Sequence, residues 1–344
     1  MKPAIREIKS YVRDTVGESL RVTGLSSPAL WARDQLTIVT FHRVLPPTML
    51  AGYPLPAIAV TPEELDHFVG VFQNHYNVGS LHAMIQLQAS GNHAGKPLLA
   101  ITFDDGQIDN YLFARPVLQS RGVHASFFVV SAAADDGELL WHDRMAFAIH
   151  HALAQGPAEL DHWLKDLGIN AWEVDPVALA VTAAKALTPG ERASKVRQLE
   201  LLTGKPVRPE WDGMMDWKHI RQMREDGHEI GSHSASHPIL PLVDDETLRK
   251  EVEGSRQRLE AQVQQPVVSF CYPNGDHDER VVLAVKRAGY AQAVTTRYGI
   301  NRRHAPQWTL RRIDLQGRYG RNIRGHFVQG ALLVRLSGRM PGAR

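Results

Sequence analysis

Residues 98–106 read Leu-Leu-Ala-Ile-Thr-Phe-Asp-Asp-Gly, an apolar run that ends in two acids and a glycine. An apolar run without alternation is typical of a strand in a parallel sheet that is covered on both faces. Parallel strands need long crossover connections, which are usually helices. The stretch therefore predicts an α/β fold in which Asp104 and Asp105 lie at the carboxyl end of a core strand.

Six other segments have the character of strands, and predicted helices separate most of them. One helix begins at a capping box, in which Thr61 is the N-cap, Pro62 follows it and Glu64 is the third helical residue. The alternation predicts a barrel or a doubly wound sheet. The predicted strands are residues 36–41, 125–130, 228–232, 267–271, 291–295 and 309–315, and the other helices are residues 111–119, 217–225, 245–264 and 279–288.

Residues 138–215 interrupt this alternation, because they are rich in Ala, Leu and Trp and contain no convincing strand. We interpret them as a helical insertion within one α/β domain that spans residues 36–315. Residues 1–35 form an N-terminal amphipathic helical segment, and residues 316–344 form a basic C-terminal segment. The apolar face of the N-terminal helix has helical spacing and consists of Ile5, Ile8, Val12, Val16 and Leu20.

The composition is that of an ordinary globular protein, with 43% hydrophobic and 22% charged residues among 344. Cys271 is the only cysteine, so an intrachain disulfide is excluded. The first 36 residues lack the apolar run of a signal peptide, and no run of eighteen apolar residues predicts a membrane-spanning helix. These features predict a cytoplasmic protein.

The charge is distributed unevenly, although the net charge is only +2. Residues 297–344 contain eleven arginines and a single acid, Asp314, so this end carries +10 and the remaining chain carries −8. A basic end suggests an anionic partner, namely a membrane surface or a lipid-linked sugar phosphate, or else a solvated tail. Nucleic acid is not expected, since no recognition motif is evident. Cations on the N-terminal helix allow contact with an anionic membrane, and they are Lys2, Arg6, Lys9 and Arg13.

A second polar cluster, Gly-Ser-His-Ser-Ala-Ser-His at residues 231–237, follows the predicted strand 228–232. In parallel barrels the catalytic residues lie at the carboxyl ends of the strands. We therefore expect the two acids, His233, Tyr272 and His42 to meet at one mouth. Each cluster alone also has an ordinary explanation, because an acidic pair before glycine often forms a turn and the chain has 17 histidines.

Two adjacent carboxylates are costly to ionise together unless a cation neutralises one of them. A divalent metal bound by Asp105, His233 and His237 would do so and would keep positions open for water and substrate. Such a metal lowers the pKa of its water to about 7. Asp104 is then free to act as the general base.

These clusters resemble the first two motifs of the polysaccharide deacetylases, also called the NodB-homology domain or carbohydrate esterase family 4. Residues 270–275, Phe-Cys-Tyr-Pro-Asn-Gly, resemble the third motif. Residues 41–44, Phe-His-Arg-Val, and residues 310–313, Leu-Arg-Arg-Ile, resemble segments of bacterial exopolysaccharide deacetylases. The resemblance implies a distorted (β/α)7 barrel that removes acetyl groups, usually from N-acetylhexosamine units.

The resemblance also implies the roles of site residues. Asp104 is the expected base, and the expected ligands of Zn²⁺, or of Co²⁺, Ni²⁺ or Fe²⁺, are Asp105, His233 and His237. The main-chain N–H of Tyr272 is expected to bind the oxyanion. We place the substrate near Pro273, Asn274, Arg311 and Trp141. Trp141 either stacks on a sugar ring or anchors the insertion to the barrel.

Two departures from the family pattern are notable. Cys271 stands where the third motif often has an arginine that pairs with the base, so Arg43, Arg311 or Arg312 must replace it. Cys271 itself is either a nucleophile or a small buried residue. The family's Leu-x-His motif, whose histidine protonates the leaving amine, is missing from residues 309–315.

We therefore expect His42 to be the general acid, with a purely structural role as the alternative. The expected substrate is an acetylated amino sugar in a bacterial surface glycan or its lipid-linked precursor, at the cytoplasmic face of the inner membrane. The alternatives are an O-acetyl esterase of the same fold and an inactive glycan-binding protein. A further cluster, Asp276-His277-Asp278, is interpreted as a helix start with Asp278 as N-cap rather than as a metal site.

Overall fold

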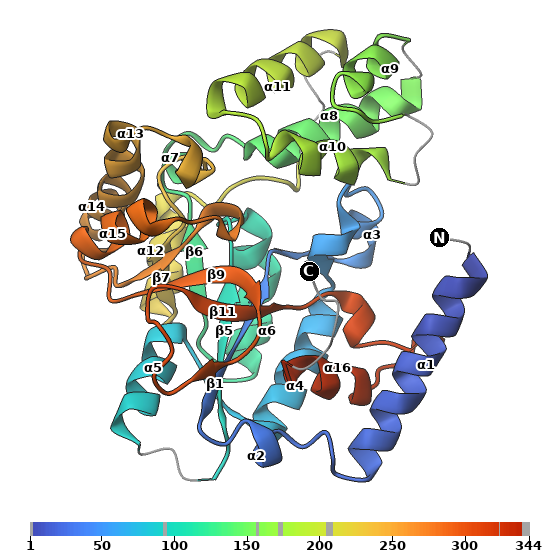
Figure 1. Cartoon of the computed structure of the whole chain (residues 1–344), viewed down its shortest axis with the longest axis vertical. Coiled ribbons are helices and arrows are strands. Elements are labelled where there is room, and N and C mark those ends of the chain that lie inside the picture. Colours follow the sequence, from blue (N-terminus) through green and yellow to red (C-terminus); the bar gives the residue numbers. More distant parts are fainter. Residues whose placement is uncertain are drawn as a thin grey trace.

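Seven parallel strands close into a barrel in the computed structural model of this chain (Figure 1). The structure describes residues 3–91, 95–155, 158–170, 175–203, 209–322 and 324–338. The ring closes where β5 pairs with β1 along its whole length. The predicted (β/α)7 barrel and its seven strands are confirmed. In ring order the strands are β1 (Gln35–Phe41), β11 (Leu310–Asp314), β9 (Gln292–Tyr298), β8 (Ser269–Cys271), β7 (Glu229–Ser232), β6 (Ser126–Val129) and β5 (Leu98–Phe103).

Four very short strands were not predicted. β4 (Asn77–Gly79) runs parallel to the start of β5, and β10 (Asn301–Arg302) runs antiparallel to the start of β1. β2 (Arg43–Val44) and β3 (Ala59–Val60) form a separate parallel pair. Segments of two or three residues are too short to show a hydrophobic period, so sequence patterns do not reveal them.

Alternate residues of the barrel strands point into the barrel. In β1 the buried cluster inside the barrel includes Leu36 and Ile38, and in β5 it includes Leu98 and Ala100. Because the side-chain period of a strand is two, Thr40 and Thr102 continue these rows, and His42 and Asp104 are the next positions. The fold thus aims His42 and Asp104 at the mouth of the barrel.

The helices that surround the barrel begin as their sequences predict. Thr61 Oγ1 accepts from the Glu64 N–H at 3.2 Å, and the Glu64 carboxylate accepts from the Thr61 N–H at 2.9 Å, which confirms the capping box. Asp278 caps α15 by accepting from the Val281 N–H, as predicted. The helices are α2 (Pro28–Trp31), α3 (Pro47–Leu50), α4 (Pro62–His75), α5 (Leu81–Ser90), α6 (Arg115–Ser120), α7 (Ser131–Asp136), α12 (Trp217–Glu225), α13 (Asp245–Arg249), α14 (Ser255–Val263) and α15 (Glu279–Arg287).

Of the described helices between β6 and β7, four fall within residues 138–215. They are α8 (Trp141–Gln155), α9 (Ala158–Lys165), α10 (Pro176–Ala184) and α11 (Pro189–Thr203). They share a buried apolar cluster of their own, and Figure 1 shows them gathered above the barrel. β6 and β7 still pair in parallel, so the insertion leaves the barrel closed. We call these four helices the cap.

A buried arginine fastens both ends of the cap to the barrel. The guanidinium of Arg43 donates to Asp109 at 2.6 Å and to Asp212 at 2.5 Å, and it lies 3.5 Å from Asp143. Asp143 is in the first turn of α8, and Asp212 follows α11 in the sequence. None of these four side chains is exposed. We call this group the Arg43 cluster.

The Arg43 cluster predicts that stability falls as pH rises. Burial raises the pKa of Asp212 to about 6, Arg43 opposes this shift and the charge of Asp143 adds to it. The pKa of Asp212 in the folded state exceeds its ordinary value, so protonation of Asp212 favours the folded state. This stabilisation is fully present below pH ~4 and is lost as pH rises through about 6. The loss amounts to about 3 kcal/mol. Asp212→Asn keeps an acceptor for Arg43 but does not titrate, so its free energy of unfolding should decline less from pH 5 to 8 in urea denaturation. Equal slopes for the two proteins would contradict this assignment.

The two ends of the chain pack together beside the barrel. α1 (Pro3–Val22) crosses α16 (Gly330–Leu336) so closely that a Cβ on Gly330 would lie 2.3 Å from the carbonyl carbon of Gly17. The C-terminal segment is therefore folded rather than a solvated tail over its described part. Arg321 pairs with Glu63 and Glu64 of α4, at 2.8 and 2.9 Å, which neutralises part of the basic charge. Residues 339–344 lie outside the described residues.

Candidate metal and catalytic site

The two acids stand at the end of β5, and each is only 2% exposed. The Asp104 N–H donates to the Phe41 carbonyl at 3.0 Å and so extends the pairing of β5 with β1. Asp105 adopts a left-handed backbone with φ of 75°. Asp tolerates this conformation better than most residues. The turn brings the Asp105 side chain to the mouth as well, where strict alternation would point it away.

The histidine loop after β7 is held by its own serines and by one acid. The His237 N–H donates to Ser234 Oγ at 3.0 Å. Glu251 accepts from the N–H groups of Ala235 and Ser236, at 2.9 and 2.8 Å. Ser234 and His237 both have positive φ, which coils the loop and returns His237 toward His233.

Asp105, His233 and His237 bring three ligand atoms within 4.8 Å of one another. The Nε2 atoms of His233 and His237 lie 3.4 and 3.5 Å from Asp105 Oδ1. All three side chains are buried. Two imidazole nitrogens and one carboxylate oxygen are a set that zinc and similar divalent metals bind.

The hydrogen bonding of His233 tests whether a cation fits this place. Its Nδ1 lies 2.8 Å from the Cys271 carbonyl oxygen, which only accepts. Nδ1 therefore carries the hydrogen, and in the neutral ring the Nε2 lone pair faces Asp105. Either a proton or a cation must lie between these two acceptors. A carbonyl behind a ligating imidazole is the usual support of a metal ligand, so the residues fit a divalent ion.

Asp105 is in the charge state that binds a metal. Burial opposes its ionisation, but the surrounding imidazoles, His233 first among them, hold the pKa of Asp105 well below its usual range. A carboxylate rather than a carboxylic acid therefore faces the two histidines. Metal ligands must be deprotonated, and Asp105 meets this condition.

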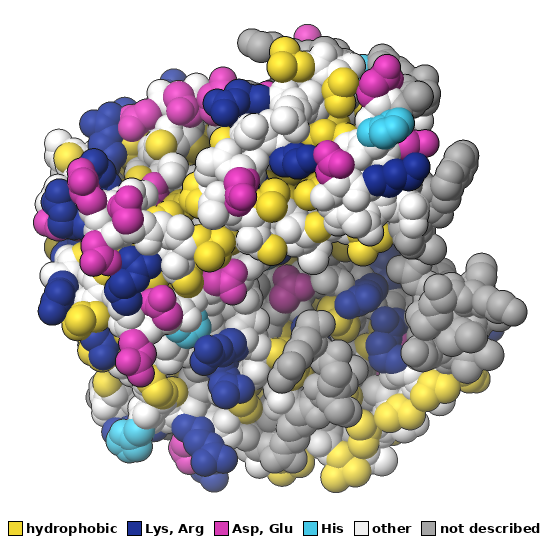
Figure 2. All heavy atoms as spheres, turned by 45° about the horizontal axis from the view of Figure 1, so that its top comes forward, with side chains coloured by type: hydrophobic (Ala, Val, Ile, Leu, Met, Phe, Trp, Pro, Cys, Tyr) yellow, Lys and Arg dark blue, Asp and Glu magenta, His cyan; other side chains and the backbone are white. Residues whose placement is uncertain are grey.

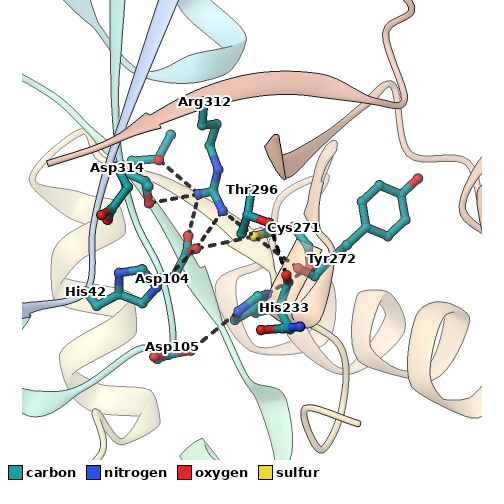
Figure 3. A network of polar contacts seen from close by, with 12 residues as sticks. His42, Asp104, Asp105, His233, Cys271, Tyr272, Thr296, Arg312 and Asp314 are labelled. Carbon is teal, nitrogen blue, oxygen red and sulfur yellow. Dashed lines mark hydrogen bonds and ion pairs between the residues drawn. The ribbon is translucent and has the colours of Figure 1, made fainter. Parts of the chain in front are cut away.

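Arg312 makes a two-pronged contact with Asp104 inside the barrel. Its Nη1 and Nη2 donate to Asp104 Oδ1 and Oδ2, both at 2.7 Å, as Figure 3 shows. Burial alone would raise the pKa of Asp104, but the guanidinium outweighs it and holds that pKa below its ordinary value. The structure thus brings Arg312, of the three arginines considered, to the expected base. Arg43 belongs to the separate Arg43 cluster.

Cys271 lies between the same groups as a thiol. Its Sγ is 3.6 Å from Asp104 Oδ2, and Arg312 donates to it at 3.2 Å. Burial raises the pKa of the Cys271 thiol, so it is protonated near neutral pH and suits a packing role rather than that of a nucleophile. Asp104, His233 and Cys271 also lie close enough to hold a metal. A protonated thiol and a carboxylate already bonded by Arg312 make that set the poorer one.

His42 faces Asp104 from the end of β1. Its Nε2 is 3.9 Å from Asp104 Oδ2, and its side chain is 24% exposed (Figure 3). Its Nδ1 has no hydrogen-bond partner among the described residues. The structure therefore brings His42 beside Asp104 and within reach of solvent.

Three of the five expected substrate-side residues, Tyr272, Pro273 and Asn274, directly follow β8. The N–H of Tyr272 donates to the Val294 carbonyl at 3.2 Å, so the expected oxyanion donor is already used in the sheet. The Tyr272 ring points away from the mouth in Figure 3, and its hydroxyl donates to the Trp308 carbonyl. Pro273 is buried, and Asn274 donates to Asp276.

Arg311 and Trp141 are the other two expected substrate-side residues. Arg311 is exposed, and its guanidinium donates to the Tyr298 carbonyl outside the barrel. In a strand, neighbouring residues face opposite sides, so Arg311 and Arg312 cannot both enter the barrel. One face of the Trp141 ring is covered by Arg192 of the cap, with 4.6 Å between Cζ and the ring centroid. Both residues belong to the cap, so this contact decides neither of the two roles considered for Trp141.

One site residue was missed by sequence reasoning. His142 of α8 lies with its Nε2 3.7 Å from Asp105 Oδ2. Sequence reasoning considered residues 141–144 as the start of the insertion and as a lining of the sugar groove, but it gave His142 no role at the metal site.

Comparison with known proteins agrees with this geometry. The sequence model of the family described as polysaccharide deacetylase matches residues 91–293, which is more than half of the chain. The chain belongs to the polysaccharide deacetylase family. This membership in carbohydrate esterase family 4 was predicted from the motifs. The match includes both acids and both histidines, whereas His42 and Arg312 lie outside it.

Curated relatives of this polysaccharide deacetylase family member are distant. YxkH of Bacillus subtilis, provisionally named a polysaccharide deacetylase, is 20% identical over 229 residues, which cover 67% of this chain and 55% of that protein. A peptidoglycan-N-acetylglucosamine deacetylase of Bacillus cereus is 31% identical over 71 residues, which cover 21% of this chain and 33% of that protein. The chain thus spans about half or less of the length of these relatives.

Solved structures share the fold. The Streptococcus pyogenes deacetylase PplD in complex with acetate has a TM-score of 0.56 at 17% identity, covering 83% of this chain and 94% of that chain. IcaB from Ammonifex degensii has a TM-score of 0.54 at 16% identity, covering 89% of this chain and 98% of that chain. At these identities the likeness concerns the fold alone.

Proposed function

We propose that this protein is a metal-dependent hydrolase that removes acetyl groups from N-acetylated sugar units of a bacterial surface polysaccharide or its lipid-linked precursor. The observation that carries the proposal is that a metal-ligand set and a separate carboxylate lie side by side. Asp105, His233 and His237 form a buried ligand set, and Asp104 beside them is an ionised carboxylate outside that set. A binding protein needs no free base next to a metal. Family membership supports the same activity.

The chain's own residues suit hydrolysis of an amide. A divalent ion held by Asp105, His233 and His237 would supply Lewis acidity toward the acetyl carbonyl and the attacking water. Asp104 takes a proton from that water, whose oxygen bonds to the acetyl carbon. Arg312 keeps Asp104 oriented and ionised through both of its oxygens. The products are acetate and the free amine.

The leaving nitrogen must gain a proton as the carbon–nitrogen bond breaks, because expulsion of an amide anion is prohibitive. His42 is the group proposed to donate it, since it is 24% exposed and lies 3.9 Å from Asp104. His42→Ala should lower kcat by about 10²- to 10⁴-fold with zinc content unchanged. Steady-state assays with metal analysis check this. A fully active variant would reduce His42 to a structural residue.

The decisive experiment measures bound metal and acetate release on the purified full chain loaded with zinc. We expect about one zinc per chain and release from N-acetylglucosamine oligomers. An O-acetylated glycan is assayed in parallel. Release from the O-acetyl substrate alone would replace the proposal with an esterase. Bound zinc without release from either substrate would favour an inactive glycan-binding protein.

We further propose a cytoplasmic location with peripheral contact to an anionic membrane through α1. None of the described helices is both long and apolar enough to cross a bilayer. α1 packs on α16 through Gly17, and this leaves Val12 and Val16, one turn apart, 53% and 50% exposed. Figure 2 shows apolar side chains in a row at the lower right edge, where α1 lies. The side chains of Lys2, Ile5, Arg6, Ile8 and Lys9, which belong to the predicted amphipathic helix, lie outside the described ones.

Vesicle sedimentation tests the membrane contact. Wild-type protein should sediment with phosphatidylglycerol vesicles at low salt, less so with phosphatidylcholine vesicles. The Val12→Asp/Val16→Asp variant should bind at least about tenfold more weakly, because each charge must be desolvated at the interface. Leu201→Asp is the matched control, since Leu201 of the cap is 85% exposed. Wild-type protein that stays wholly in the supernatant would overturn the contact.

A further inference from the structure

We propose that His142 of the cap is a positioning residue of the metal site. Its Nε2–H donates to Asp105 Oδ2, the outer carboxylate oxygen, which faces the cap. The inference rests on the proposed function, because it concerns the same ligand set. It gives the helical insertion a role in the chemistry of the barrel, whereas the ligand set itself comes entirely from β5 and the loop after β7.

The two oxygens of Asp105 face different partners. Oδ1 lies 3.4 and 3.5 Å from the Nε2 atoms of His233 and His237. Oδ2 lies 3.7 Å from the Nε2 of His142, whose ring centroid is 5.5 Å from that of His237. The His142 side chain is 11% exposed. The inner oxygen thus serves the ligand set and the outer oxygen faces the cap.

The surroundings of His142 Nε2 decide which atom carries the hydrogen. Nε2 lies 3.7 Å from Asp105 Oδ2 and 3.8 Å from Asp143 Oδ2, so it stands between two carboxylates. Ionised carboxylates only accept hydrogen bonds. His142 does not belong to the group of ligand atoms that lie within 4.8 Å of one another in the described part of the chain. A hydrogen on Nε2, which either carboxylate can accept, therefore fits this position better than a lone pair directed at a metal. His142 is a donor to the ligand Asp105, not a fourth ligand.

The neighbouring residue keeps His142 in place. Asp143 is fully buried, and it accepts from the Tyr53 hydroxyl at 2.8 Å and from Gln107 Nε2 at 2.7 Å. Arg43 lies 3.5 Å from its second oxygen. The first turn of α8 is thereby fixed to the barrel through the Arg43 cluster. The dipeptide His142-Asp143 joins that cluster to the metal site.

A distance of 3.7 Å is longer than a hydrogen bond, and contacts of this kind in active sites tighten when the site is loaded. A donor on the outer oxygen keeps the carboxylate in one orientation and leaves the inner oxygen to the cation. Partners of this type typically change metal affinity or activity by about 10- to 100-fold.

Three variants of the full chain test the role of His142. His142→Ala removes the donor, His142→Gln restores an N–H donor, and His150→Ala changes an exposed histidine of the same helix. The zinc dissociation constant is measured by competition with a chromophoric chelator, the Co²⁺ absorption spectrum reports the ligands, and thermal unfolding without metal reports the fold.

We expect His142→Ala to weaken zinc binding by about 10- to 100-fold with an unchanged Co²⁺ band position. His142→Gln should recover most of the affinity, and His150→Ala should bind as wild type. Wild-type affinity in His142→Ala would overturn the proposal, as would a Co²⁺ spectrum that indicates a lost nitrogen ligand. Zinc affinity is measured without substrate, so a protein that binds zinc but releases no acetate would overturn the proposed function and leave this test intact.

Discussion

Asp104→Asn should lower acetate release by at least about 10³-fold while zinc content stays near one per chain. Asparagine has nearly the shape of aspartate but cannot take a proton from water. The ligand set of Asp105, His233 and His237 does not include Asp104, so the metal should remain. The measurement is kcat/KM on N-acetylglucosamine oligomers, together with metal analysis of the same preparation.

Two controls make this result specific. Asparagine still offers Arg312 one oxygen, and thermal unfolding must show that the variant is folded at the assay temperature. Asp105→Asn should instead lose both zinc and activity, because it changes a ligand. Loss of zinc in Asp104→Asn would indicate that the metal is bound by Asp104, His233 and Cys271. Retained turnover would remove Asp104 from the role of base.

The barrel itself was predictable because its strands are apolar runs that end in polar residues. The positions of His42 and Asp104 also follow from alternation along β1 and β5. The same rule separates Arg311 from Arg312. Leu310 belongs to the cluster inside the barrel, so Arg312, two residues later, faces inward and Arg311 faces outward. Sequence reasoning considered both arginines and placed Arg311 at the substrate. It did not use the alternation of side chains along the strand, which separates the two.

Other features of the site depend on distant parts of the chain. The N–H of Tyr272 was expected to bind the oxyanion, but the next strand of the barrel, β9, uses it at Val294. His142 lies beside Asp105 in a segment whose neighbours Asp143 and Asp212 both contact Arg43. No local pattern encodes an anchor formed by residues 43, 143 and 212. Such features become visible only when tertiary packing is known.

Arg312→Met is expected to impair both stability and turnover, because one side chain serves both. Arg312 is 1% exposed, and besides Asp104 it donates to Thr40 Oγ1 at 2.9 Å and to the Thr295 carbonyl at 2.9 Å. Removing it leaves a buried carboxylate without its counter-charge. Breaking a buried pair in this way costs about 3–5 kcal/mol. Urea denaturation of the two proteins measures this loss.

The effect on turnover follows from the same contact. Without the guanidinium, burial dominates and raises the pKa of Asp104, so the base is protonated over more of the acidic range. The acidic limb of the kcat/KM profile should move to higher pH, with activity at neutral pH reduced by at least about tenfold. Arg311→Met is the matched control, since it removes an exposed arginine one position away and should change neither quantity. If the two variants had the same kcat/KM pH profile, the charge of Arg312 would not set the protonation state of Asp104. The loss of stability in Arg312→Met would then reflect packing alone.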